Sequence, residues 1–250
     1  YDIDPERALK AITLTSRIIA AELLSSGINV DCLPVLDVPQ EAADPIIGDR
    51  AYAKTPDLVA IIGRMAAQAL LDHGVVPVIK HIPGHGRALV DSHLALPRVD
   101  TDLDVLRRVD FAPFKALQDM PMAMTAHIIY SSLDEKNCAT LSSQIIQTII
   151  RDELGFQGLL MSDDLSMKAL TGDFGARAKG AISAGCDIAL HCNGDPLEMH
   201  QIANALTSIE DLSHKRLTDA MRRPISQLAH PSSKELIEWV RERDALCAQQ

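Results

Sequence analysis

The sequence is poor in basic charge and in aromatic side chains. Its 250 residues carry 24 Lys and Arg against 34 Asp and Glu, which gives a net charge of −10 with neutral histidines. Because phosphate binding draws on clustered basic charge, this balance argues against nucleic acid or an anionic membrane surface as a partner. Aromatic residues make up only 3% of the chain, which is low for a groove that binds a polysaccharide and favours a short soluble substrate.

Long apolar runs and a cysteine framework are also missing. No apolar stretch approaches the roughly 18 residues of a membrane-spanning helix, and the first ten residues, YDIDPERALK, are too charged for a signal peptide. The five cysteines are an odd number without CxxC spacing, so the sequence predicts neither a disulfide framework nor a thiolate zinc site. We therefore expect a cytoplasmic protein, and we expect it to be a monomer.

The sequence does contain a regular alternation of helical and extended apolar segments. Apolar residues at helical spacing predict helices over residues 5–26, 55–73, 102–118, 142–154 and 174–184. Short apolar runs that predict strands follow at 28–37, 75–80, 122–127, 159–163 and 187–191, and beyond Pro196 the pattern is helical to the end. Strands that are almost continuously apolar and alternate with helices indicate a parallel sheet covered on both faces.

Polar residues are placed at the carboxyl ends of these predicted strands. They are Asp37, Lys80, His81, His127, Asp163, Asp164 and Asn193. In a (β/α)8 barrel such ends converge on a single mouth, whereas a doubly wound open sheet spreads them along one edge. We therefore predict an α/β fold of the (β/α)8 TIM-barrel type, although only five of the eight strands are readable.

The segment Lys80–His93 contains three of the nine histidines, and it follows a predicted strand directly. One interpretation is a glycine-rich surface loop with incidental histidines. A second is a metal site formed by His81, His85 and His93, since histidine is a common ligand. Its weakness is that Pro83-Gly84 prevents the helix from which an H-x3-H pair normally chelates. We predict no metal or other cofactor, and we expect His85 to shape the loop.

The third interpretation is acid/base catalysis by Asp91 and His93. Their i, i+2 spacing lets the carboxylate accept the imidazole N–H, which fixes the tautomer and raises the basicity of the ring. A third reactive group is available in the segment SDDLSM, where Asp163 presents a carboxylate that can attack an electrophilic carbon. The alternative for Asp163 and Asp164 is helix capping. We expect one of the two acids to cap and the other to react.

Taken together, these motifs resemble the signatures of glycoside hydrolase family 3. The motif KHIPGHG followed by DSH, and then SDDLSM, resembles in particular the bacterial β-N-acetylglucosaminidases of peptidoglycan recycling. LDV at 36–38 and IGDR at 47–50 occur in the expected order, and the resemblance runs from about residue 10 to about residue 195. In that family Asp163 would be the nucleophile, and His93, paired with Asp91, would replace the second carboxylate of most retaining glycosidases. Three positions match those that hold N-acetylglucosamine: Arg50, Lys80 and His81.

The resemblance implies a single-barrel catalytic domain over residues 1–250 whose first three strands are absent from this chain. The helices of 196–250 are expected on the flank of the barrel. The implied function is that of an exo-acting, retaining β-N-acetylglucosaminidase. Its expected substrates are muropeptides, such as the disaccharide that ends in 1,6-anhydro-N-acetylmuramic acid. Two alternatives stay open, namely a metal-dependent barrel hydrolase that uses the loop histidines and a catalytically inactive sugar-binding module.

Overall fold

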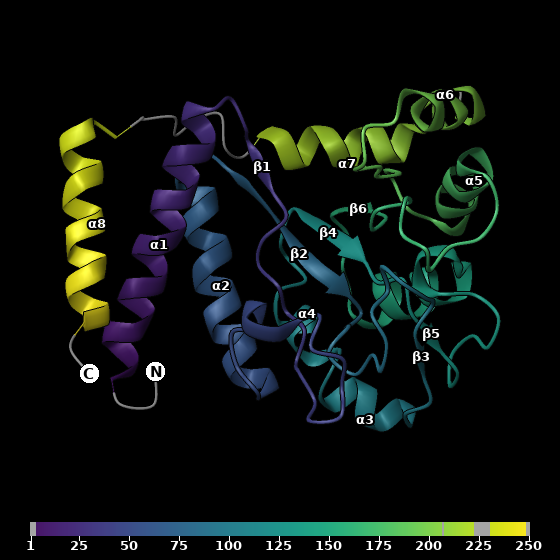
Figure 1. Cartoon of the computed structure of the whole chain (residues 1–250), viewed down its shortest axis with the longest axis horizontal. Coiled ribbons are helices and arrows are strands. Elements are labelled where there is room, and N and C mark those ends of the chain that lie inside the picture. Colours follow the sequence, from purple (N-terminus) through teal and green to yellow (C-terminus); the bar gives the residue numbers. More distant parts are fainter. Residues whose placement is uncertain (1–3, 207, 223–230, 249–250) are drawn as a thin grey trace.

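The computed structural model describes residues 4–206, 208–222 and 231–248 and shows helices packed around a parallel sheet (Figure 1). The helices are α1 (Pro5–Ser25), α2 (Pro56–Asp72), α3 (Leu103–Arg108), α4 (Ala112–Ala116), α5 (Phe174–Ala184), α6 (Pro196–Ala205), α7 (Asp211–Arg222) and α8 (Ser233–Ala248). The strands are β1 (Val30–Asp31), β2 (Val76–Ile82), β3 (Arg98–Val99), β4 (Met122–Thr125), β5 (Ile129–Tyr130) and β6 (Leu159–Met161). Shorter helical segments are the 3-10 turns η1 (Gly48–Arg50) and η2 (Ala139–Leu141) and the π-type helix η3 (Ile145–Glu153).

The main sheet has the strand order β1-β2-β4-β6, and all of its pairs are parallel. An isolated bridge between Met161 and Ile188 continues it by one further segment. The helices α1 and α2 pack against each other, and α8 lies alongside α1 (Figure 1). This order confirms the prediction of an α/β fold with a parallel sheet. None of the helices in the described residues is long and apolar enough to cross a bilayer.

The strand expected over 28–37 is regular only at Val30–Asp31. Pro34 has no N–H to donate, and this interrupts the ladder. The segment nevertheless follows β2, because the Lys80 N–H donates to the Pro34 carbonyl over 3.1 Å and the Leu36 N–H donates to the Lys80 carbonyl over 2.7 Å. The expected position of this segment is therefore right, and its expected regularity is wrong.

The strand expected over 187–191 is likewise reduced to a bridge. The Ser162 N–H donates to the Ile188 carbonyl over 2.9 Å, as in a parallel ladder. The next bond in that direction is made by a side chain, because the Leu190 N–H donates to the Ser162 hydroxyl over 2.9 Å. The hydroxyl replaces a backbone acceptor, and the regular pairing ends there.

The single helix expected over 102–118 is wrong, because two short helices occupy this segment. α3 ends at Arg108, and α4 begins at Ala112 with Pro113 in its first turn. A proline in the interior of a helix removes a hydrogen bond and clashes with the preceding turn, whereas it is tolerated in the first turn. The helices expected over 5–26, 55–73 and 174–184 are present as α1, α2 and α5. Residues 223–230, part of the expected C-terminal helices, lie outside the described residues.

The two faces of the sheet pack against different partners. On β2, Ile79 belongs to the main core under the surrounding helices, whereas Val76 and Val78 belong to a second cluster on the opposite face. This alternation is the two-residue period of a strand. The second cluster is closed by α7 through Leu217 and Ala220. The helix thus covers apolar side chains of β2, β4 and β6 on this face.

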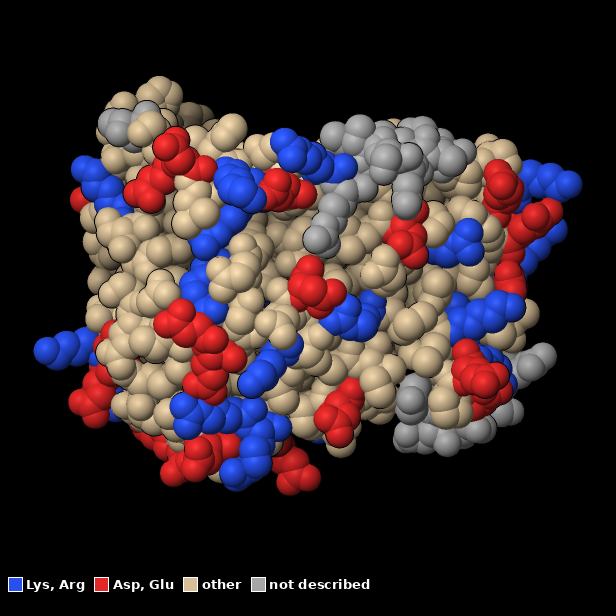
Figure 2. Space-filling model, turned by 180° about the vertical axis from the view of Figure 1, so that it is seen from behind, with Lys and Arg blue, Asp and Glu red and all other residues tan. Residues whose placement is uncertain are grey.

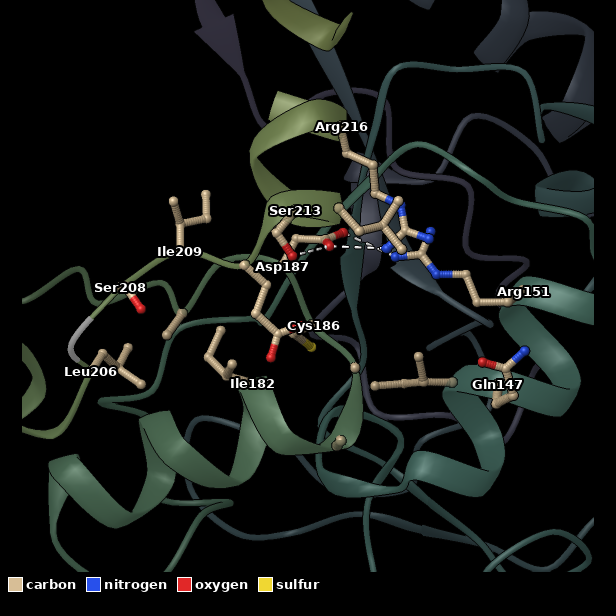
Figure 3. Close-up of a pocket in the computed structure, with 16 residues that line it drawn as sticks. Gln147, Arg151, Ile182, Cys186, Asp187, Leu206, Ser208, Ile209, Ser213 and Arg216 are labelled. Carbon is tan, nitrogen blue, oxygen red and sulfur yellow. Dashed lines mark hydrogen bonds and ion pairs between the residues drawn. The ribbon is translucent and has the colours of Figure 1, made fainter. Parts of the chain in front are cut away.

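A buried carboxylate fixes α7 against the sheet. Asp187 accepts the Leu160 N–H over 2.8 Å, and it also accepts hydrogen bonds from three side chains. These come from Arg151 on η3 over 3.0 Å and from Ser213 and Arg216 on α7 over 2.6 and 3.0 Å (Figure 3). The four bonds satisfy both carboxylate oxygens, as a buried charge requires. A cavity of about 510 Å³ lies beside this cluster, and it contains none of the predicted site residues.

The loop that follows β2 is held firmly at its base. The Tyr130 hydroxyl donates to the Gly84 carbonyl over 2.5 Å. A Cβ on Gly86 would lie 2.0 Å from the Val38 carbonyl oxygen, so only glycine permits this close approach of two backbones. These contacts at Gly84 and Gly86 fix the path of the loop where it leaves the end of β2.

An ion pair between Arg87 and Asp110 adds a second anchor to the loop. The Arg87 Nε donates to Asp110 Oδ2 over 2.6 Å, and the Asp110 side chain is only 1% exposed. The other oxygen of this carboxylate, Oδ1, is buried without a hydrogen-bond partner. Burial therefore outweighs the neighbouring guanidinium and raises the pKa of Asp110 to about 6.

We predict that Asp110→Asn changes how stability depends on pH. The raised pKa means that Asp110 stabilises the wild-type fold fully below its unfolded pKa and loses this contribution as the pH rises through about 6. The amide that replaces the carboxylate does not titrate, so the stability of the variant does not fall with the ionisation of this side chain. Relative to wild type, the free energy of unfolding of the variant should therefore improve by up to about 3 kcal/mol between pH 4 and pH 8. Urea unfolding at both pH values measures this, and a pH-independent difference would contradict it.

Candidate active site

A cavity of about 290 Å³ opens at the carboxyl ends of β2, β4 and β6. Five of the six predicted site residues line it: Arg50, Lys80, His81, His93 and Asp163. They come from η1, from β2, from the loop after β2 and from the turn after β6. The sixth, Asp91, reaches the cavity through its contact with His93. Residues that are far apart in the sequence thus converge at one mouth, as predicted for parallel strands.

Asp163 is the carboxylate whose charge the cavity favours. Its Oδ1 accepts the N–H of Asp164 over 2.8 Å. Burial alone would raise the pKa of Asp163, but the imidazoles of His81 and His127 together with the Asp164 N–H outweigh it, so that the pKa is lowered. Asp163 is therefore an anion at neutral pH, which is the form of a carboxylate that attacks carbon.

The orientation of His81 is set by Asp37. The Nδ1–H of His81 donates to Asp37 Oδ2 over 2.7 Å, and the backbone N–H groups of His81 and His85 donate to Asp37 Oδ1 over 3.3 and 2.6 Å. Burial opposes ionisation of Asp37, but these donors lower its pKa. Because Nδ1 carries the proton, Nε2 of His81 is left to accept a hydrogen bond. The sequence marked Asp37 only as a polar strand end, and this function was missed.

His127 is a second residue that the predicted site did not include. Its ring is buried, with Nδ1 2.7 Å from the Thr140 hydroxyl and Nε2 3.1 Å from the Asp164 carbonyl. Burial lowers the pKa of His127, against the attraction of Asp163. Because a carbonyl oxygen can only accept, Nε2 of His127 carries a proton and donates it to the Asp164 carbonyl, which fixes the backbone of the turn after β6. Its position at the carboxyl end of a strand was the available signal.

Asp91 and His93 form the contact predicted from their spacing. The Nδ1–H of His93 donates to Asp91 Oδ1 over 2.7 Å, and the His93 backbone N–H donates to the same oxygen over 2.8 Å. The small burial of Asp91 opposes ionisation, but these two bonds from His93 lower its pKa. The His93 side chain is 57% exposed, and its Nε2 is available to exchange a proton with a bound molecule.

Asp164 has a structural function in the turn after β6. Its Oδ1 accepts the N–H groups of Ser166 and Cys192 over 2.9 and 3.0 Å, and the Ser166 hydroxyl donates to Oδ2. A cap was expected for one of the two adjacent acids, and Asp164 satisfies N–H groups in this way. Asp164 stabilises a turn and not the start of a helix, so the expectation that one of these acids caps a helix is wrong.

Arg50 and Lys80 are cationic hydrogen-bond donors in the cavity lining. The Arg50 guanidinium donates to the Ile46 carbonyl over 2.6 Å, which fixes one nitrogen and leaves the other donors for a ligand. Lys80 lies in β2 and lines the cavity. By the two-residue period of a strand, its side chain is on the same face of the sheet as Val76 and Val78, which belong to the cluster that α7 closes. Both cationic side chains present directed donors suited to hydroxyl and carbonyl oxygens.

The three loop histidines of the metal hypothesis have separate partners. His81 contacts Asp37, His93 contacts Asp91, and His85 Nε2 lies 3.1 Å from the Ser92 hydroxyl. Among the residues that the structure describes, no group of three or more His, Cys, Asp or Glu side chains is arranged to hold a metal ion. The described geometry thus offers no ligand set for that hypothesis.

Comparisons with known proteins agree on one family. The model of the glycosyl hydrolase family 3 N-terminal domain matches residues 3–227. A β-hexosaminidase of Alkalilimnicola ehrlichii is 37% identical over 229 residues, which are 90% of this chain and 65% of that protein. A β-hexosaminidase of Methylococcus capsulatus is 39% identical over 196 residues, which are 77% of this chain and 58% of that protein. The chain thus spans about two thirds or less of these relatives.

Solved structures show the same relationship. NagZ of Neisseria gonorrhoeae in complex with N-trifluoroacetyl-D-glucosamine superposes with a TM-score of 0.84 at 30% identity. The match covers 96% of this chain and 70% of that one. The parallel sheet is therefore part of a TIM-barrel-like α/β fold, as predicted. On the family match over 3–227 and these relatives, the chain belongs to glycosyl hydrolase family 3.

Proposed function

We propose that the protein is a retaining exo-β-N-acetylglucosaminidase. The observation that carries this proposal is the placement of the ionised Asp163 and the His93–Asp91 pair at one cavity. A nucleophile with a lowered pKa and a histidine oriented by a carboxylate are the two groups that double displacement at an anomeric carbon requires. Membership of family 3 and relatives named β-hexosaminidase support the same reaction class.

In the first step Asp163 attacks the anomeric carbon while His93 gives its proton to the departing glycosidic oxygen. The transition state carries positive charge on the sugar ring, which the nearby carboxylate stabilises. In the second step His93 takes a proton from water, the water oxygen bonds to the anomeric carbon, and the Asp163 carboxylate leaves. Two displacements restore the original configuration. Asp91 holds the ring of His93 in one tautomer throughout.

Arg50, Lys80 and His81 are proposed to hold the N-acetylglucosamine unit. The two cations donate to sugar oxygens, and Nε2 of His81 accepts a hydroxyl proton because Nδ1 is bound to Asp37. The cavity of about 290 Å³ is at the small end of ligand sites and suits a single terminal sugar, which supports exo action. The ligand of the Neisseria gonorrhoeae relative is itself a glucosamine derivative.

The proposed substrates are soluble muropeptides that carry terminal N-acetylglucosamine, such as fragments ending in 1,6-anhydro-N-acetylmuramic acid, and the proposed location is the cytoplasm. The low aromatic content supports a short substrate, and five free cysteines suit a reducing compartment. On the face shown in Figure 2, acidic and basic side chains are interspersed without a large basic patch. This agrees with a small substrate rather than a polyanion. We propose that the protein acts as a monomer.

The first test replaces the proposed nucleophile. Asp163→Ala should lower the hydrolysis of an aryl β-N-acetylglucosaminide at least about a thousandfold, because Asp163 supplies the carboxylate of the proposed covalent intermediate. Binding of N-acetylglucosamine, measured by calorimetry, should be largely retained. The matched control is Asp100→Ala, which removes an exposed carboxylate outside the cavity lining. Turnover of Asp163→Ala within tenfold of wild type would remove Asp163 from this role.

The second test concerns proton transfer by His93. In His93→Ala, kcat/KM for alkyl or sugar leaving groups should fall by about 10²–10⁴, since their departure requires a proton. Activated phenol leaving groups depart without one, so kcat/KM for a dinitrophenyl glycoside should change little. The ratio of kcat/KM between the two substrates is the measurement. Equal losses on both substrates would show that His93 does not protonate the leaving group.

A further inference from the structure

The loop tip that carries the acid/base pair has few contacts of its own. The side chains of Asp91 and His93 bond to each other, and the Asp91 carbonyl accepts the N–H of Leu94 within the same turn. The apolar residues on either side do not pack, because Leu89 is 62% exposed and Leu94 is 67% exposed. Neither of these two leucines therefore holds the pair at the cavity.

Ser92, which lies between the two members of the pair, is the exception. It is 2% exposed, whereas its neighbour His93 is exposed, so the turn directs Ser92 inward. Its hydroxyl lies 3.1 Å from Nε2 of His85. Both residues line the cavity. Within the described part of the chain, this side-chain hydrogen bond connects the tip to the buried part of the loop.

His85 is fixed independently of this bond. Its ring is 3% exposed and meets His81 edge-on at a centroid distance of 5.5 Å. Its backbone N–H donates to Asp37 over 2.6 Å, a bond that does not depend on its side chain. Burial lowers the pKa of His85, so the ring is neutral and makes an uncharged hydrogen bond to Ser92.

We propose that the His85–Ser92 hydrogen bond is a latch that holds His93 and Asp91 at the cavity, which makes His85 a positioning residue acting through Ser92. This proposal rests on the proposed function of His93. Because the latch serves proton transfer, its loss should affect only reactions in which His93 protonates the leaving group. A neutral hydrogen bond corresponds to about 3- to 10-fold in rate.

The experiment compares Ser92→Ala, Ser92→Thr and His85→Gln in the purified protein. Ser92→Ala and His85→Gln should lower kcat/KM about 3- to 10-fold for a poor alkyl leaving group and leave it unchanged for a dinitrophenyl glycoside. Ser92→Thr keeps the hydroxyl and should restore the rate. The matched control is Ser132→Ala, which removes an exposed hydroxyl that donates to the Thr101 carbonyl. It should behave as wild type on both substrates.

A double variant separates positioning from simple loss of folding. In the His93→Ala background, adding Ser92→Ala should cause no further loss, because there is no longer a proton donor to position. A loss that is equal for both leaving groups, or that persists in this background, would overturn the latch, and so would wild-type kinetics of Ser92→Ala. If His93→Ala itself shows no leaving-group dependence, the proposed function fails and the latch fails with it. If His93→Ala shows the leaving-group dependence and Ser92→Ala does not, the latch proposal fails and the proposed function stands.

Discussion

The carboxylate of Asp37 is the constraint on which the site depends. It is completely buried, and it accepts two N–H groups from His81 at the end of β2 and one from His85 in the loop that follows. These bonds join two neighbouring strand ends, and they determine which nitrogen of His81 faces the cavity. They also fix the backbone at His85, from which the loop continues to Asp91 and His93. A buried anion needs this number of donors to remain charged, so the loop backbone cannot shift without leaving Asp37 unsatisfied.

The contrast between Asp163 and Asp110 shows that environment, and not residue type, determines charge in this region. Asp110 is buried, whereas Asp163 is half-buried in the lining of the cavity. Asp163 is surrounded by imidazoles and a backbone N–H, and its pKa is lowered. Asp110 has one arginine partner and one unsatisfied oxygen, and its pKa is raised to about 6. The first arrangement maintains an anion where the proposed reaction needs one, and the second anchors the loop.

Much of this organisation could be predicted from the sequence, because it depends on local pattern. The spacing of apolar residues predicted the parallel strands, and residues at their carboxyl ends are brought together by the parallel topology itself. Pro113 is a local signal in the sequence for the break between α3 and α4, and the prediction of one helix over 102–118 did not use it. The Ser162 hydroxyl ends the regular strand pairing because it replaces a backbone acceptor. Such a side-chain hydrogen bond leaves no periodic pattern in the sequence. The partner of α7 is likewise decided by packing between segments far apart in the sequence.

The long-range contacts of the site explain the remaining gaps. Asp37 lies 44 residues before His81, and neither motif indicates that the two side chains form a hydrogen bond. The pairing of His85 with Ser92 spans only seven residues, yet it requires a loop that turns back on itself. The motifs therefore indicated the candidate site residues. The tertiary structure was needed to show that Asp37 orients His81 and that His85 contacts Ser92.

The most direct test of the account is to trap the covalent intermediate. A 5-fluoro N-acetylglucosaminyl fluoride destabilises the oxocarbenium-like transition states of both steps while its good leaving group permits the first. Mass spectrometry of proteolytic peptides should then find one glycosyl unit on the peptide that contains Ser162–Asp163–Asp164, attached to Asp163. A glycosyl unit on any other residue, or hydrolysis of a natural substrate to the inverted anomer, would contradict the account.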